Sequence, residues 1–119
     1  MSEHTIKATA YGSLWLTGTI DDFPFGIKVY DRKSPNGIKR GRVSKLYVKD
    51  KNSSIELFSY DRGWGRKPQT EAQQDLLNAL LRFAASLPRN EVWSQGFKKQ
   101  HVFFVDEENV LEVEPDNLT

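Results

Sequence analysis

The chain has 119 residues, 38% of them hydrophobic and 28% charged, which is typical of one folded domain rather than a disordered segment. It has no cysteine, and this excludes a disulfide framework, a thiol nucleophile and a thiolate metal site. The net charge is only +1, and no apolar run approaches the roughly 20 residues of a membrane-spanning helix, so we expect a cytoplasmic protein with no membrane partner.

Alternation of apolar and polar residues predicts five strands in the first half of the chain. They cover residues 6–11, 14–20, 23–30, 42–49 and 54–60. The connections are short except for residues 31–41, where Ser34-Pro35-Asn36-Gly37 is a dense turn signal. Because a parallel crossover needs a dozen or more residues, these connections favour an antiparallel meander.

A long helix follows the strands. Thr70 is a suitable N-cap, Gln73 stands three residues later as a capping-box partner, and Pro88 ends the helix. Its apolar stripe recurs at helical spacing from Leu76 to Leu87. Residues 90–95 favour a further helical turn, and residues 101–105 with 110–113 favour a final hairpin.

The order of these elements predicts an α+β fold: an antiparallel β-meander of four to five strands packed on one long helix, followed by a short C-terminal β-hairpin. We expect residues 1–119 to form a single domain, with 1–5 and 114–119 flexible and 89–119 an extension after the main helix. One sheet face packs on the helix, and the other faces solvent, a partner or the C-terminal tail. The edges of so short a sheet are compatible with a homodimer that would cover them.

Charge is distributed unevenly along the chain. Residues 28–67 hold twelve Lys or Arg and four Asp or Glu, a net +8, whereas residues 68–119 carry a net −5. Such asymmetry indicates an anionic partner for the basic segment. The alternative is that folding places the two signs side by side, so that no basic patch forms.

Within the basic segment, residues 37–46 and 60–68 both combine glycine with Lys or Arg, and the second also holds Tyr60 and Trp64. Arginine matches phosphate with a planar fork, and aromatic faces stack on the bases of single strands. We therefore expect nucleic acid, single strands included, as the partner, with phosphate contacts from the cations and stacking by Trp64. The alternative for Trp64 is that it covers the core beneath the helix. The candidate binding residues are Arg40, Arg42, Lys45, Tyr60, Arg62, Trp64, Arg66 and Lys67.

Catalytic and metal-binding patterns are weak in this sequence. His4 lies in the expected flexible start and His101 opens a strand, and two distant histidines without cysteine do not predict a transition-metal site. The acidic run 106–108 is typical of a solvated hairpin turn. We therefore predict no catalytic residue, metal or cofactor, and a small hydrolase using His101 is the enzymatic alternative.

The segment 15–68 resembles a family of small proteins from phages, plasmids and bacterial mobile elements. The resemblance is carried mainly by Gly41-Arg42-Val43-Ser44-Lys45-Leu46 and Tyr60-Asp61-Arg62-Gly63-Trp64. It implies a bacterial host cell but no particular activity, although small phage proteins of this size often inhibit host defences. The strands followed by a helix are also similar in topology to Whirly and transcriptional-coactivator domains, which bind single-stranded DNA, although fold analogy does not establish function.

Two functions are therefore expected. The first is an accessory protein that binds nucleic acid or a host nucleoprotein through the basic, aromatic segment 28–67. The alternative is a host-defence inhibitor, similar to anti-CRISPR proteins, that acts by contact with a protein effector. Arg and Trp are enriched both in protein–protein hot spots and on nucleic-acid-binding surfaces. The composition of segment 28–67 therefore does not distinguish nucleic-acid binding from inhibition by protein contact.

Overall fold

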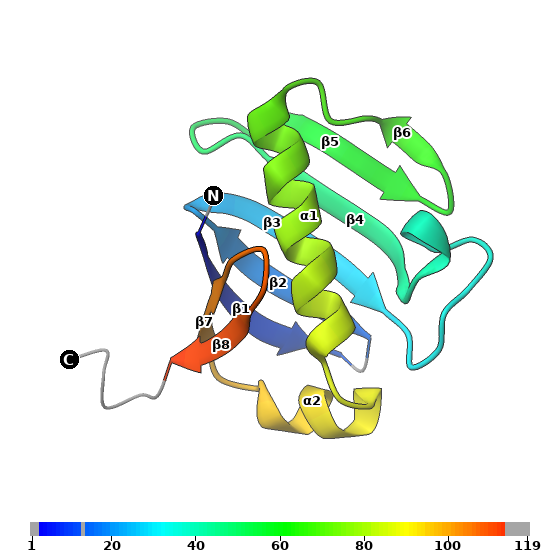
Figure 1. Cartoon of the computed structure of the whole chain (residues 1–119), viewed down its shortest axis with the longest axis vertical. Helices are drawn as coiled ribbons and strands as arrows, with labels where there is room; N and C mark the ends of the chain where they lie inside the picture. The colour runs from blue at the N-terminus through cyan, green and yellow to red at the C-terminus, as the bar shows by residue number, and fades with distance from the viewer. Residues whose placement is uncertain (1–2, 13, 114–119) are drawn as a thin grey trace.

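The computed structural model describes residues 3–12 and 14–113, which form an eight-stranded antiparallel sheet and two α-helices. The strands follow the spatial order β6-β5-β4-β3-β2-β1-β7-β8 (Figure 1). They are β1 (His4–Tyr11), β2 (Trp15–Ile20), β3 (Phe23–Val29), β4 (Val43–Lys49), β5 (Glu56–Asp61), β6 (Trp64–Arg66), β7 (His101–Val105) and β8 (Val110–Val113).

This sheet corrects the expectation of a four- to five-stranded meander on one long helix with a separate hairpin. Strands β1 to β5 are antiparallel neighbours in chain order, as their short connections indicate. However, β6 adds to β5, and β7 pairs with β1, with Ile6 opposite Phe103. The C-terminal hairpin therefore extends the same sheet. Strand β1 would otherwise leave its edge unpaired, and a pairing between opposite ends of the chain has no local sequence signature.

The helices lie on one side of the sheet (Figure 1). Helix α1 (Glu71–Ser86) begins as the sequence predicts, because the Gln73 N–H donates to Thr70 Oγ1 at 3.1 Å. The Gln73 side chain completes the cap by accepting from the Gln69 N–H at 2.7 Å. Helix α2 (Asn90–Gly96) confirms the helical turn predicted near residue 90 and buries Trp93.

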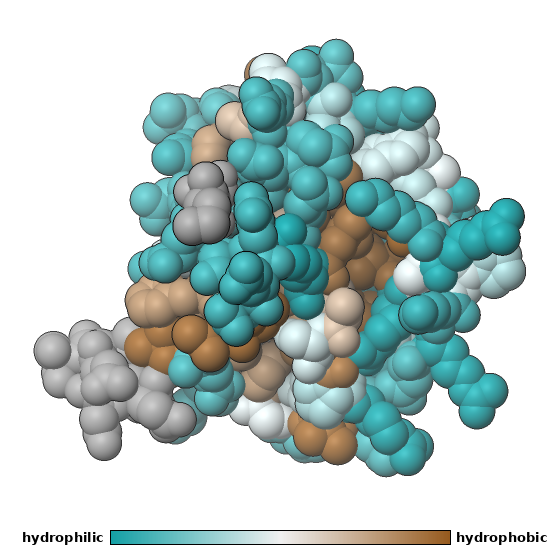
Figure 2. Space-filling view, viewed as in Figure 1, coloured by the Kyte–Doolittle hydropathy of each residue, from teal (hydrophilic) through white to brown (hydrophobic). Residues whose placement is uncertain are grey.

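The core lies between α1 and the sheet. Alternate residues of the central strands face it, since successive side chains of a strand point to opposite faces. Figure 2 shows hydrophobic surface on the side of α1 that faces the 3₁₀ turn η1 (Ile38–Arg40), where a cavity of about 250 Å³ is lined in part by Val43 and Leu81. Neither helix in the described ranges has the length and apolarity needed to cross a membrane. Fully buried core residues include Ile6, Leu16, Ile20, Ile27, Val48, Phe58, Leu80 and Phe83.

Residues 1–5 and 114–119 were both predicted to be flexible, and the prediction is wrong for residues 4 and 5. Residues 4 and 5 belong to β1, and His4 is buried with its Nδ1 against the carboxylate of Asp21. The Thr5 N–H donates to the same carboxylate at 2.8 Å. The end at 114–119 lies outside the described residues. Residues 89–113, expected as an extension, supply α2 and the two strands that complete the sheet.

Candidate nucleic-acid interface

The second face of the sheet carries no helix among the described elements, and it presents aromatic and basic side chains. Cross-strand partners share a face, and the register places Trp15 opposite Lys28, and Lys28 opposite Lys45. Tyr47 and Lys49 follow on the same side of β4. All five side chains are half-buried. We call the surface formed by Trp15, Lys28, Lys45, Tyr47 and Lys49 the open face.

Tyr47 lies across the neighbouring strand at the centre of the open face. Its partner in the register is Gly26. A Cβ atom on Gly26 would lie 2.3 Å from Cε2 of the Tyr47 ring, so the ring occupies the space that a side chain would take. The Lys49 ammonium lies 5.0 Å from the ring centroid, a cation–π contact that keeps positive charge beside the ring.

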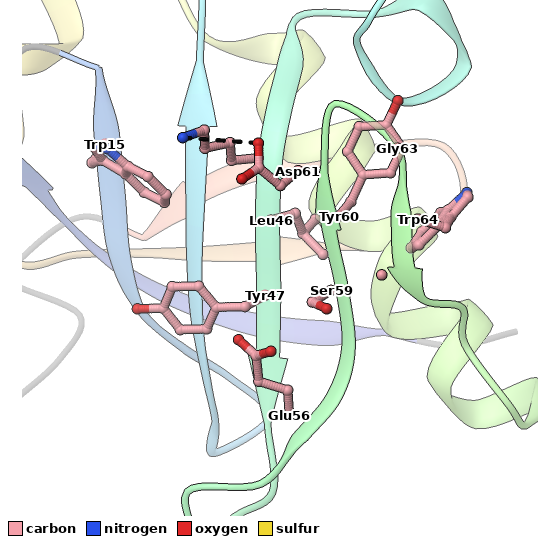
Figure 3. Close-up of a pocket in the computed structure, with 11 residues that line it drawn as sticks. Trp15, Leu46, Tyr47, Glu56, Ser59, Tyr60, Asp61, Gly63 and Trp64 are labelled. Carbon is pink, nitrogen blue, oxygen red and sulfur yellow. Dashed lines mark ion pairs between the residues drawn. The ribbon is translucent and has the colours of Figure 1, made fainter.

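A shallow cavity of about 570 Å³ extends from the open face to β6. Figure 3 shows Trp15 and Tyr47 on one side of it and Trp64 at the far margin. Its lining includes the acids Glu56 and Asp61. Lys45 Nζ lies 3.8 Å from Asp61 Oδ1, so positive and negative charges meet here and the cavity is not uniformly basic.

A second cavity, of about 450 Å³, adjoins the open face through Lys28 and Lys45. We call it the cationic pocket, because four of its lining residues are basic and none is acidic. The Lys28 ammonium beside the Tyr30 phenol lowers the pKa of that phenol from its ordinary value of 10.0, which reports the positive environment. Its lining residues are Lys28, Tyr30, Arg32, Ser34, Asn36, Ser44, Lys45 and Arg62.

The cations predicted from the sequence are spread over several places. Lys45 and Arg62 line the cationic pocket, with Arg62 Nε 3.2 Å from Asp61 Oδ1. Arg66 is exposed on β6, and the register places it beside Ser59 on the side of Tyr47. Lys67 is exposed just after β6, and Arg40 is exposed in η1. These two lie outside both cavities.

Arg42 has a structural role at the end of α1. Its guanidinium donates to the carbonyls of Ala84 at 3.2 Å, Leu87 at 2.7 Å and Pro88 at 2.9 Å. Its Nε donates to the Tyr30 carbonyl at 2.7 Å. The last carbonyls of a helix lack partners within the helix and attract positive charge. Arg42 supplies both the hydrogen-bond donors and the positive charge at this helix end. It is not part of the open face.

Tyr60 and Trp64 lie on the helix side of the sheet, since both share the register position of buried Leu46. Their rings meet edge to face, with centroids 5.1 Å apart at 79°. Both are half-buried and pack against the core, and the Tyr60 hydroxyl donates to the Asn36 carbonyl at 2.8 Å. The structure thus favours the core-covering alternative for Trp64 over its presentation on the open face.

Sequence reasoning missed Trp15, Lys28, Arg32 and Ser44 as site residues. A weak signal for Trp15 and Lys28 was present, because each occupies the outward position of an alternating strand. No local pattern shows that Arg32 and Ser44 meet in one pocket, since a loop from β3 to β4 brings them together.

His101, the residue of the enzymatic alternative, lines neither the open-face cavity nor the cationic pocket. Its Nδ1 lies 3.1 Å from Glu112 Oε1, and its ring packs on Phe97. Within residues 3–12 and 14–113, no group of three or more His, Asp or Glu is placed to hold a metal ion.

Together the fold and the site define a small protein whose one-sided antiparallel sheet packs helices on one face and presents aromatic and basic residues on the other. Residues 14–85 match the family described as "Domain of unknown function (DUF7678)". The chain belongs to this family, whose description assigns it no function. The matched residues include all of the open face and the cationic pocket. No curated protein and no solved structure matches the chain.

Proposed function

We propose that this protein binds nucleic acid on the open face and acts as a binding protein rather than an enzyme. The observation that carries the proposal is the grouping of Trp15 and Tyr47 with three lysines on a sheet face that no described helix covers. The sequence resemblance of residues 15–68 to proteins of mobile elements suggests a bacterial host for this role.

The chemistry of the open face suits a single strand. Aromatic rings on a flat surface stack only on bases that are not already stacked in a duplex, and such stacking tolerates any base sequence. The lysines supply the phosphate contacts that give affinity without sequence preference. Arg66 lies beside this surface and extends its positive charge towards the sheet edge.

The test is fluorescence anisotropy of labelled single- and double-stranded oligonucleotides at several salt concentrations. We expect the single strand to bind more tightly, and the affinity to fall steeply as salt rises. Tyr47→Ala should weaken binding about tenfold through lost stacking, and Lys28→Ala should lower the salt slope by about one. Lys99→Ala is the matched control, because this exposed lysine lines neither cavity.

Two results would overturn the proposal. One is the absence of binding even at low salt, in which case capture of a host protein effector becomes the leading function. The other is binding that Tyr47→Ala and Lys28→Ala leave unchanged, which would move the contact away from the open face.

A further inference from the structure

The cationic pocket has the composition of an anion site. Its four basic side chains come from four places in the fold: Lys28 on β3, Arg32 in the loop after it, Lys45 on β4 and Arg62 in the β5–β6 turn. Asp61 contacts Lys45 and Arg62 from outside the pocket, so the pocket itself keeps an excess of positive charge. Charges that repel one another stay close together only where the fold holds them or an anion joins them.

A buried hydroxyl in the same pocket points to the ligand. Ser44 is 5% exposed and lines the pocket beside the Tyr30 phenol, whose pKa is lowered by Lys28 and also by the Ser44 hydroxyl, but the Ser44 Oγ has no partner among the described residues within normal hydrogen-bond geometry. Leaving a buried hydroxyl unpaired costs free energy, and such groups usually have a partner. An oxygen of a bound anion would accept the Ser44 proton, while the cations around it neutralise the charge.

The backbone around the pocket is already in place. The Arg62 N–H donates to the Ser44 carbonyl at 3.0 Å, which ties the β5–β6 turn to β4. The Tyr60 hydroxyl holds the carbonyl of Asn36, and the Ser34 N–H donates to the Gly41 carbonyl at 3.0 Å, which shapes the loop on the other side. A preformed site binds its ligand without the cost of ordering loops.

We propose that the cationic pocket is a phosphate-binding subsite, with Arg32, Arg62, Lys28 and Lys45 around the phosphate and Ser44 donating to one of its oxygens. Its volume of about 450 Å³ lies in the range of small-ligand sites, so the pocket takes more than a bare phosphate. Lys28 and Lys45 belong to both the pocket and the open face. A strand whose bases lie on Trp15 and Tyr47 would therefore place one phosphate here. This part of the inference rests on the proposed function.

The first test uses inorganic phosphate and the full chain. We expect saturable amide shifts in ¹H–¹⁵N spectra at residues 30–34, 44–45 and 62. Arg32→Ala should raise the dissociation constant for phosphate about tenfold and Ser44→Ala about threefold. Lys33→Ala is the matched control, because this exposed neighbour of Arg32 does not line the pocket. Shifts that never saturate, or equal weakening by Arg32→Ala and Lys33→Ala, would overturn the inference.

A second test identifies the source of the phosphate. Oligonucleotides with a 5′-phosphate, a 3′-phosphate or neither are compared for binding to the unmodified protein and to Arg32→Ala. A terminal phosphate in the pocket would make affinity depend on the end group, and Arg32→Ala would remove that dependence. An internal phosphate would give equal affinities for the three strands, all lowered by Arg32→Ala.

The two proposals fail in different ways. If phosphate binds saturably and no strand binds, the pocket assignment holds and the proposed function falls. If strands bind in a manner that needs Tyr47 while phosphate gives no saturable shift and Arg32→Ala has no effect, the proposed function holds and the pocket assignment is wrong.

Discussion

The ring of Tyr47 lies over Gly26, so closely that a Cβ atom on Gly26 would be 2.3 Å from Cε2 of the ring. Glycine on β3 is therefore what allows an aromatic side chain on β4 to lie across the sheet. This pair builds the centre of the open face from two adjacent strands.

Gly26→Ala should weaken nucleic-acid binding while the protein stays folded with only a small loss of stability. The added methyl group displaces the Tyr47 ring, whose outer end is free to move, so we expect a loss of stability of no more than about 1 kcal/mol. Misplacement of the ring should lower affinity about fivefold. Anisotropy and urea unfolding measure the two effects, with Gly96→Ala as control because nothing lies within 4 Å of its added Cβ. Unchanged affinity together with a displaced ring would contradict a stacking role for Tyr47.

Arg42→Ala should destabilise the fold and leave the salt dependence of binding unchanged. The substitution removes four hydrogen bonds to carbonyls, three of them at the end of α1, and we expect a loss of about 2–3 kcal/mol. Arg42→Lys should restore only part of it, because an ammonium lacks the planar fork. The urea midpoint reports stability, and Arg40→Ala, at an exposed site, should change it little. A lower salt slope for Arg42→Ala would instead place Arg42 in the nucleic-acid contact.

The β7–β8 turn should lose stability in acid. The carboxylate of Asp106 accepts from the Glu108 N–H at 2.8 Å and from the Asn109 N–H at 2.6 Å, and these bonds lower the pKa of Asp106 below 3.8. A lowered pKa in the folded state means that the stabilisation is present above pH 3.8 and is lost as pH falls through the folded value. The protection of amides in β7 and β8, which compares their exchange with the intrinsic rate at the same pH, should therefore fall below pH 3.8.

Asp106→Asn is the control for this effect, because the amide oxygen still accepts hydrogen bonds but does not titrate in this range. The difference in protection between the two proteins should shrink as pH falls. A constant difference between pH 6 and pH 2.5 would show that the Asp106 charge contributes nothing to the turn.

Tyr30 should ionise below its ordinary pKa of 10.0. The neighbouring Lys28 ammonium lowers the pKa of Tyr30 below 10.0, and absorbance at 295 nm during an alkaline titration should show an early step. Tyr30→Phe should remove this step, and Lys28→Met should move it to higher pH, whereas Lys99→Met should not. Phosphate in the cationic pocket opposes formation of a phenolate, so added phosphate should also move the step upward. An unchanged step in saturating phosphate would argue against phosphate beside Tyr30.

Local sequence patterns predicted most elements well. The five early strands and α1 lie within about two residues of their expected bounds, because alternation and helical spacing are set by burial on one face. Thr70 and Gln73 located the start of α1 through hydrogen bonds that span only a few residues. Strand β6 was missed because its three residues are too short for a period to appear.

The candidate site was predicted only in part. Lys45 and Arg62 do meet in a basic pocket, but Arg42 turns to a helix end that is more than forty residues away along the chain. Tyr60 and Trp64 lie on the helix side, since the register of β4, β5 and β6 aligns them with Leu46. A side chain's charge or ring is visible in the sequence, whereas the face on which it lies depends on the register between strands.

Local sequence was enough to predict seven of the eight strands, both helices, the helix cap and the concentration of basic residues between positions 28 and 67, because each follows from contacts between near neighbours or from composition. The folded structure was needed to show that β7 pairs with β1, that Tyr47 lies on Gly26, and that Ser44 shares a pocket with four cations. These relationships join residues from different strands and loops, and their pairing is set by the packing of the whole sheet against α1 rather than by any local pattern.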